Sequence, residues 1–90
     1  KKKTENSAYT FKLYPNPNNG MMELEYHINT RDGGYISITN VLGQQLDEVN
    51  LAGGKNNIHI NESRLNNGIY FYRIFVDDKM KDYGKFIINK

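Results

Sequence analysis

Apolar and polar residues alternate in several short segments of this chain, and this alternation restricts the fold more than any other feature. Between Met22 and Ile28 every second residue is apolar, and most residues between them are polar. Residues 35–40 and 57–61 repeat the pattern. A period of two is typical of a β-strand with one face buried and the other in water. No stretch shows the longer period of an extended helix, so the chain is predicted to be all-β.

Residues that favour turns separate these segments at short intervals. Gly, Asn and Asp are concentrated in residues 30–34, 52–56 and 77–79. Short strands joined by such turns predict an Ig-like antiparallel β-sandwich of about seven short strands. We expect helix at most as a single turn in residues 62–68, ending at a glycine.

Two of the expected strands depart from simple alternation. Residues 45–51 are irregular because Leu46 and Val49 have opposite parity, which predicts a bulge or an edge position. Residues 69–76 are apolar at both parities. This pattern predicts a central strand that is covered on both faces. Residues 80–88 form the last expected strand.

The first expected strand ends in a dense run of turn residues, Pro15-Asn16-Pro17-Asn18-Asn19-Gly20. Proline has no amide donor, so strand pairing must stop at Tyr14, and this strand belongs at a sheet edge. Asn and Gly tolerate positive φ. We therefore expect residues 18–20 to supply such conformations at the entry to the next strand.

Composition excludes several classes of protein. The chain has 90 residues, which suits one small domain, and it has no Cys, which excludes a disulfide scaffold and a thiolate zinc site. The net charge is only +2, with charges of both signs scattered along the chain. A nucleic-acid partner is therefore not expected. No apolar run approaches the ~18 residues of a membrane-spanning helix, so no membrane span is expected. Residues 1–8 are polar and predict a linker.

No catalytic, cofactor or metal site is expected. His27 and His59 are isolated at polar strand positions, without a second ligand at metal spacing. Asp77-Asp78 lacks the alternating oxygen ligands of a calcium loop and is better explained as a hairpin tip. No Ser, His and Asp lie in an arrangement typical of a triad. The sequence therefore predicts a protein that is not an enzyme.

The aromatic residues of the 69–76 segment leave an alternative open. We assign Phe71 and Phe75 to the core, and we expect Tyr70 and Tyr72 to form a stripe on the surface. Such a stripe, or Tyr83, would suit an accessory carbohydrate-binding or adhesion module of a larger secreted protein.

Four short motifs follow one another along the chain. They are LYPNP at residues 13–17, ITNVLGQ at 38–44, LNNGIYF at 65–71 and GKFIINK at 84–90. As an ordered set they resemble the C-terminal sorting domain (type A) of the type IX secretion system, over about Phe11 to Lys90.

The resemblance implies a non-catalytic secretion signal at the end of a protein from Bacteroidota. Residues 1–10 would link it to an upstream cargo domain, and residues 11–90 would be the sorting domain. The parent would pass through the periplasm, and the outer-membrane type IX translocon would recognise the folded domain. A surface sortase would then remove the domain upstream of the strands, leaving the cargo at the cell surface or released.

By position, the resemblance assigns recognition to ten residues. They are Pro15, Asn16, Pro17, Gly68, Tyr70, Lys85, Phe86, Ile87, Ile88 and Lys90. We expect residues 85–90 to lie at a sheet edge and to offer unpaired backbone groups for docking by strand addition, with Lys85 and Lys90 contributing charge. Deleting Asn89-Lys90, or the last six residues, is expected to block secretion and to leave the sandwich folded.

Overall fold

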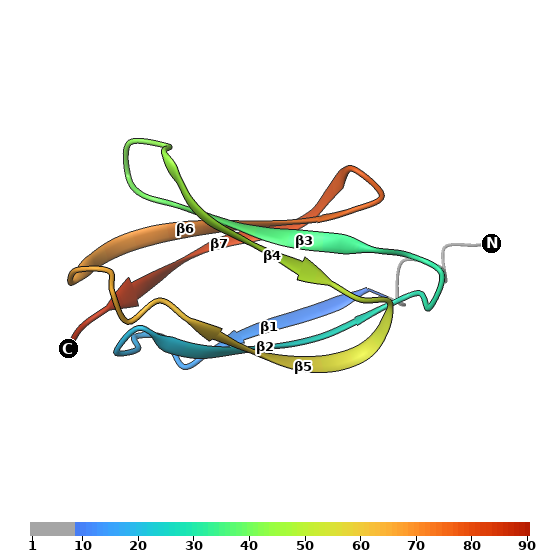
Figure 1. Ribbon diagram of the computed structural model, residues 1–90, viewed down its shortest axis with the longest axis horizontal. Coiled ribbons are helices and arrows are strands. Elements are labelled where there is room, and N and C mark those ends of the chain that lie inside the picture. Colours follow the sequence, from blue (N-terminus) through green and yellow to red (C-terminus); the bar gives the residue numbers. More distant parts are fainter. Residues whose placement is uncertain (1–8) are drawn as a thin grey trace.

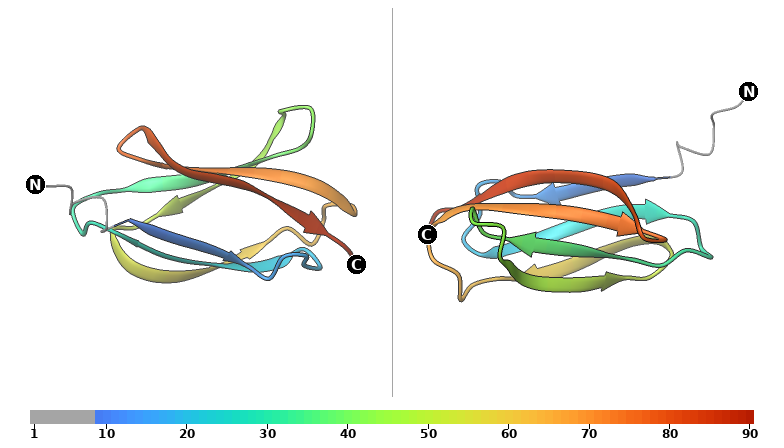
Figure 2. Two further views of the ribbon diagram at one scale, coloured as in Figure 1. Left: turned by 180° about the vertical axis from the view of Figure 1, so that it is seen from behind. Right: turned by 90° about the horizontal axis from the view of Figure 1, so that it is seen from above.

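The computed structural model describes residues 9–90 and shows two antiparallel sheets packed face to face (Figure 1). One sheet has the strand order β1-β2-β5 and the other has the order β4-β3-β6-β7, as the view from above shows for the second sheet (Figure 2). No helix occurs in this part of the chain. The predicted antiparallel sandwich of seven strands is therefore confirmed. The strands are β1 Thr10–Tyr14, β2 Met21–Ile28, β3 Gly34–Thr39, β4 Gln45–Leu51, β5 Gly54–Asn61, β6 Gly68–Val76 and β7 Lys79–Ile88. The predicted linker 1–8 lies outside the described residues.

The core lies between the sheets and follows the alternation of β2. Met22, Leu24, Tyr26 and Ile28 are all buried, with at most 2% of their surface exposed. Alternate residues of β3, β6 and β7 face them from the other sheet, among them Ile36, Ile38, Ile74, Val76, Phe86 and Ile88. Each such side chain contributes about 1.5–3 kcal/mol through burial. The hydrophobic pattern of the sequence therefore specifies which face of each strand points inward.

β6 is central, as predicted, but only one of its faces is covered. It pairs with β3 on one side and with β7 on the other. Tyr70, Ile74 and Val76 are buried, whereas Ile69 and Phe71 on the opposite face are exposed. The prediction of two covered faces was wrong because a two-layer sandwich places nothing outside its sheets. The apolar residues at the second parity make an outer surface instead.

The aromatic residues of β6 consequently lie the other way round from the prediction. Tyr70 is buried and Tyr72 is half-buried against the core, so they do not form a surface stripe. Phe71 is exposed on the outer face, where Phe75 stacks on Tyr35 with 5.0 Å between the ring centroids. A carbohydrate platform built on Tyr70 is therefore excluded.

The irregular segment 45–51 has the predicted bulge and the predicted edge position. β4 is the outermost strand of its sheet. Ile38 is opposite Asp47 and Thr39 is opposite Gln45, so Leu46 is the additional residue. This shift explains the opposite parities of Leu46 and Val49, because a bulge reverses the face on which later residues lie.

Residues 62–67 form a turn and a crossing between the sheets, and the predicted helical turn is absent. Leu65 N donates to Glu62 O at 3.0 Å, and Ser63 N donates to the side chain of Asn61 at 2.9 Å. The segment must carry the chain from β5 in one sheet to β6 in the other, across the spacing of about 10 Å between packed sheets. The crossing uses most of residues 62–67, so too few residues remain to form a helical turn. Gly68 begins β6 and does not end a helix.

Candidate functional site: a C-terminal cluster

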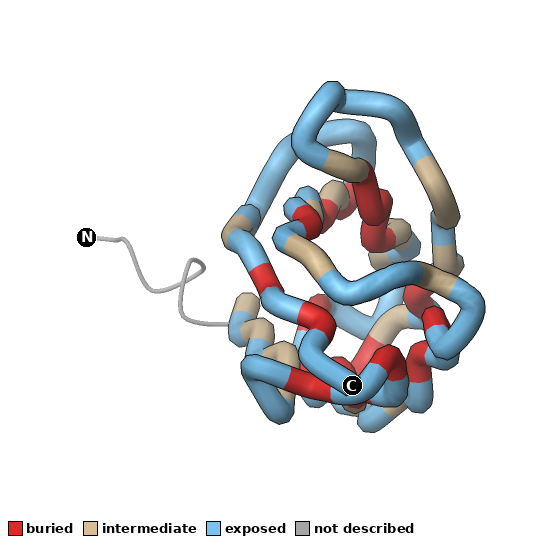
Figure 3. The backbone as a smooth tube through the Cα atoms, turned by 90° about the vertical axis from the view of Figure 1, so that its left-hand side faces the viewer, coloured by how far each residue is buried: buried red, intermediate tan, exposed pale blue. Residues whose placement is uncertain are grey.

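The structure brings three of the sequence motifs together at one end of the sandwich. The loop between β1 and β2, the loop between β5 and β6 and the end of β7 all lie there (Figure 1), and Figure 3 views this end directly. Asn18 forms a parallel bridge with Ile88, and Gly68 is opposite Ile88 in the β6–β7 pair. We call this group the C-terminal cluster. It comprises residues 15–18, residues 66–70 and residues 85–90.

Asn16 holds the end of β7 through its side chain. Its Nδ2 donates to Lys85 O at 3.1 Å, and its Oδ1 accepts from Ile87 N at 3.0 Å. The amide therefore satisfies one acceptor and one donor of the strand, much as a neighbouring strand would. Asn16 itself is exposed, so this contact forms part of the surface.

Asn18 continues this pairing through its backbone. Its N–H donates to Ile87 O at 2.9 Å, and its carbonyl accepts from Asn89 N at 2.8 Å. β7 is an edge strand, as predicted. The expectation that residues 85–90 offer unpaired backbone groups was wrong, however, because the loop from Pro15 to Asn18 already occupies the outward edge at Lys85, Ile87 and Asn89.

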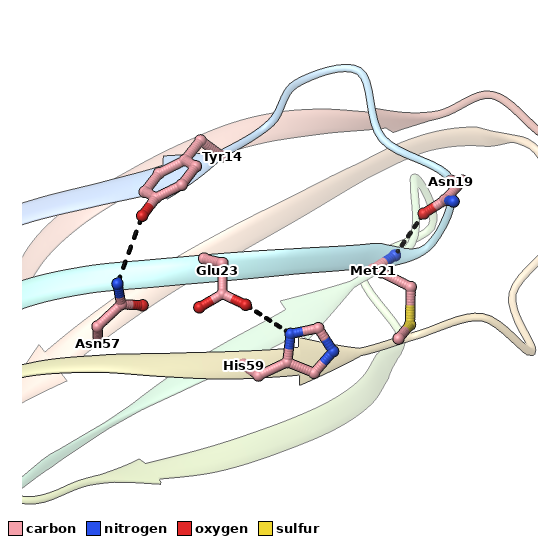
Figure 4. A network of polar contacts seen from close by, with 6 residues as sticks. All are labelled: Tyr14, Asn19, Met21, Glu23, Asn57 and His59. Carbon is pink, nitrogen blue, oxygen red and sulfur yellow. Dashed lines mark hydrogen bonds and ion pairs between the residues drawn. The ribbon is translucent and has the colours of Figure 1, made fainter.

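The loop is shaped by its asparagine side chains. The Nδ2 of Asn18 donates to Pro15 O at 3.2 Å, and its Oδ1 accepts from Gly20 N at 2.7 Å, while Asn18 itself is buried. Asn19 Oδ1 accepts from Met21 N at 3.1 Å (Figure 4). Only Gly20 has the expected positive φ, +104°. The two asparagines therefore serve as hydrogen-bonding caps and not as positive-φ positions. The peptide bonds before both prolines are cis.

Close packing explains why residue 20 is a glycine. A Cβ there would lie 2.8 Å from Ser63 Cα, and Glu62 N donates to Gly20 O at 2.6 Å. The loop after β1 is thereby fixed against the crossing after β5. Both loops of the C-terminal cluster are held in one arrangement.

Tyr70 and Phe86 support the cluster from inside. Both are buried, and their rings stack with 5.7 Å between centroids. The hydroxyl of Tyr70 donates to Asn66 O at 2.7 Å, which ties the β5–β6 loop to β6. Ile88 is buried beside them. These three residues position the surface and are not available to a partner.

Lys90 closes the cluster on the side of the β5–β6 loop. Its backbone N–H donates to Asn67 Oδ1 at 2.9 Å, and its Nζ donates to Ser63 O at 2.7 Å. Lys85 and Ile87 point outward, since they alternate with the buried Phe86 and Ile88. The exposed surface of the cluster thus combines polar and basic side chains with the apolar side chains of Ile69 and Ile87.

Sequence reasoning missed Asn18 and the pair Asn66-Asn67 as parts of this site. Asn18 had been assigned only to the turn, and Asn66-Asn67 had been quoted only within a motif. Asparagines at loop positions adjoining β7 supply both donors and acceptors, so they can replace a strand partner. Which loop meets which strand depends on the tertiary fold and is not visible as a local pattern.

A buried carboxyl adjoins the cluster. The side chain of Glu62 is 0% exposed, and its Oε1 lies 3.6 Å from a guanidinium nitrogen of Arg64. Neither carboxyl oxygen has a hydrogen-bond partner among the described residues. Burial, followed by the neighbouring carboxyl of Asp47, raises the pKa of Glu62 to about 7, while Arg64 acts in the opposite direction. The neighbouring Glu62 is in turn the largest cause that lowers the pKa of Asp47. A proton held on Glu62 beside an ionised Asp47 accounts for both directions.

The other candidates from the sequence do not form a chemical site. His59 Nδ1 lies 2.6 Å from Glu23 Oε2 on the outer face of the three-stranded sheet (Figure 4), and His27 lies elsewhere on β2. Asp77 and Asp78 form the tip of the β6–β7 hairpin and have positive φ. Within residues 9–90 no three side chains of His, Cys, Asp or Glu are grouped as metal ligands would be. The same residues include no helix that is long and apolar enough to span a membrane.

Comparison with known proteins gives one family match. Residues 12–89 match the family model described as the secretion system C-terminal sorting domain. The match covers most of the chain and contains every part of the C-terminal cluster except Lys90. The comparison with curated proteins gives no significant match.

Proposed function

Since the chain belongs to the family of secretion system C-terminal sorting domains, we propose that the C-terminal cluster is the surface by which the type IX machinery recognises it. A domain of this family is a non-catalytic signal that directs secretion of its parent protein across the outer membrane in Bacteroidota. The family also implies interaction with the secretion machinery and with an upstream cargo. The surface that carries this interaction is our proposal.

The assembly of distant motifs into one surface supports the proposal most strongly. Asn16 bonds to Lys85 and Ile87 although 69 positions separate it from Lys85. Nine of the ten residues assigned by resemblance divide into two groups, and the tenth, Gly68, is half-buried at the start of β6. Tyr70, Phe86 and Ile88 are buried and act as support. The exposed residues, which would contact a partner, are Pro15, Asn16, Pro17, Lys85, Ile87 and Lys90.

The resemblance to sorting domains implies the transport route. The parent enters the periplasm, the sorting domain folds there, and the outer-membrane translocon binds the C-terminal cluster. A surface sortase then cuts upstream of β1, and the cargo stays at the surface or is released. Because the β7 edge is already paired at Lys85, Ile87 and Asn89, the partner reads side chains and not free backbone groups.

A secretion assay tests the proposal. Residues 1–90 are fused behind a periplasmic reporter in a Bacteroidota host, and the reporter is measured in periplasm, cell surface and medium. Lys85→Ala and Ile87→Ser change exposed side chains of the cluster, so the sandwich should remain folded. Both variants are expected to leave most reporter in the periplasm. Lys55→Ala and Asn57→Ala on β5 are the matched controls and should behave like the wild type.

Of the two deletions proposed from the sequence, only the shorter suits the same assay. Removing the last six residues deletes Phe86 and Ile88, which are fully buried, so this variant loses part of its core. Removing only Asn89 and Lys90 leaves the core intact. Normal secretion by the two-residue deletion together with both cluster variants, at unchanged melting temperature, would refute the proposed surface.

A further inference from the structure

The two outer faces of the sandwich differ in chemistry. The face of the three-stranded sheet carries polar side chains such as Glu23, Asn57 and His59 (Figure 4). On the four-stranded sheet, apolar residues face the solvent. Of the large apolar side chains exposed among residues 9–90, all except Met21 lie on this sheet or its hairpins. They are Val41, Leu42, Ile69, Phe71, Met80, Tyr83 and Ile87. Large exposed apolar patches on soluble proteins mark interaction sites.

A cavity of about 260 Å³ opens in this apolar face. Phe71 and Arg73 of β6, Tyr83 of β7 and Val41 of the β3–β4 hairpin line it. The β3–β4 and β6–β7 hairpins both rise from the sheet on the side away from the three-stranded sheet (Figure 1). The outer face is therefore bounded at both ends of its strands and is shaped to receive another molecule.

The polar groups at the cavity restrict what can bind. Asn40 Oδ1 accepts from Leu42 N and Gln44 N at 2.9 and 3.0 Å, and its Nδ2 donates to Gln44 Oε1 at 3.2 Å. The side-chain amide of Asn40 thus makes its hydrogen bonds within the β3–β4 hairpin. Thr39 is only 5% exposed. The side chains of Asn40 and Thr39 are therefore of little use to a ligand, and the polar side chains that remain in the lining are Tyr72, Arg73 and Tyr83.

Arg73 is the charged residue of the cavity, and no carboxylate lines it. Among residues 9–90 its guanidinium has no ion-pair partner, since the described ion pairs are His59–Glu23 and Arg64–Glu62. A guanidinium pairs most favourably with a carboxylate, through two parallel hydrogen bonds. Charge therefore favours an occupant that is apolar and carries an acidic group.

We propose that the outer face of the four-stranded sheet docks a segment of a type IX machinery protein, with an apolar side chain in the cavity and an Asp or Glu paired with Arg73. This inference rests on the proposed function and adds a second contact surface, centred on the cavity, which adjoins the C-terminal cluster at Ile69 and Ile87. Tyr and Arg are enriched among the residues that supply most binding energy in protein interfaces, and Phe is enriched at interface cores.

Secretion of the same reporter tests this surface first. Tyr83→Ser and Arg73→Gln alter exposed side chains, so their melting temperatures should match the wild type. Each is expected to reduce the secreted fraction about tenfold, the size of an interface hot-spot effect. Met21→Ser and Glu25→Gln on the opposite face are the controls and should secrete normally. If the wild-type fusion itself stays in the periplasm, the proposed function fails. If the wild type is secreted and the cluster variants are not, but Tyr83→Ser and Arg73→Gln are secreted normally, this second surface alone is refuted.

A photo-crosslinking amino acid in place of Tyr83, which is 69% exposed, identifies the occupant directly. The full chain fused to the reporter is irradiated in secreting cells and in cells that lack the translocon. The expected product is a translocon-dependent adduct whose mapped peptide contains Asp or Glu beside apolar residues, and which Arg73→Gln abolishes. The same crosslinker at His27 should give no such adduct. An adduct with a second copy of this chain or with a glycan, or no adduct above the His27 control, would overturn the proposal.

Discussion

Replacing Glu62 by Gln should remove a pH-dependent loss of stability from this domain. The carboxyl of Glu62 is fully buried and is neutral in the fold at acidic pH, since its pKa is raised from an ordinary 4.5 to about 7. The unfolded chain gives up this proton at lower pH than the folded chain does. The favourable contribution is therefore complete below about pH 4.5 and is lost as the pH rises to about 7 and above.

The size of the effect follows from the two pKa values. A carboxyl whose pKa moves from 4.5 to about 7 on folding contributes up to about 3 kcal/mol. Glu62→Gln keeps the shape and an N–H that can donate to Asp47, but it cannot ionise. Wild type and variant should have similar free energies of unfolding at pH 5. At pH 8 the variant should be more stable by up to about 3 kcal/mol, or roughly 12–24 °C in melting temperature.

Urea denaturation between pH 4.5 and 8.5 measures this difference. Changes that are common to both proteins cancel when the two curves are subtracted. Glu25→Gln, at an exposed position on β2, is the matched control and should run parallel to the wild type. A difference between wild type and Glu62→Gln that stays constant from pH 5 to pH 8 would show that Glu62 is already ionised in the folded domain.

Three further predictions concern stability. Tyr70→Phe removes the hydroxyl that donates to Asn66 O and should cost about 1 kcal/mol in urea denaturation; no change would mean that this bond does not hold the β5–β6 loop. Gly20→Ala should lower the free energy of unfolding by about 2 kcal/mol or more, because φ at this position is +104° and Ser63 leaves no room for a Cβ. Gly43→Ala, at φ +84° with open space around it, should lower it by only about 1 kcal/mol. Equal losses of stability in the two variants would contradict the packing argument. Circular dichroism should show that deletion of the last six residues abolishes cooperative unfolding while deletion of the last two preserves it.

The sequence was sufficient to predict the strands, because alternation reports directly which face of a strand is buried. It predicted the edge position of β1 from two prolines, and the bulge in β4 from the opposite parities of Leu46 and Val49. Whether the second face of β6 is buried was not predictable in this way. A strand with apolar residues on both faces looks the same whether the second face is buried under another layer or is a binding surface.

The candidate site was predictable as a set of residues but not as an arrangement. The motifs identified Asn16, Tyr70 and Lys85, yet nothing in the chain indicates that an asparagine side chain pairs with a strand 69 positions later. That contact depends on the crossing of β5 to β6, which fixes the loop after β1 against Ser63. Long-range packing of this kind has no local pattern in a single sequence.

Under the proposed function, the pairing of Asn16 with the last strand makes recognition conditional on conformation. In an extended or partly folded chain the two segments are separate, and neither alone displays the surface that they form together. A receptor that contacts both segments thus binds the folded domain and does not bind unfolded or partly folded chains. Substitutions at Phe86 or Ile88, which are buried, should then abolish export as completely as substitutions in the proposed contact surface, because the two segments would no longer be held together.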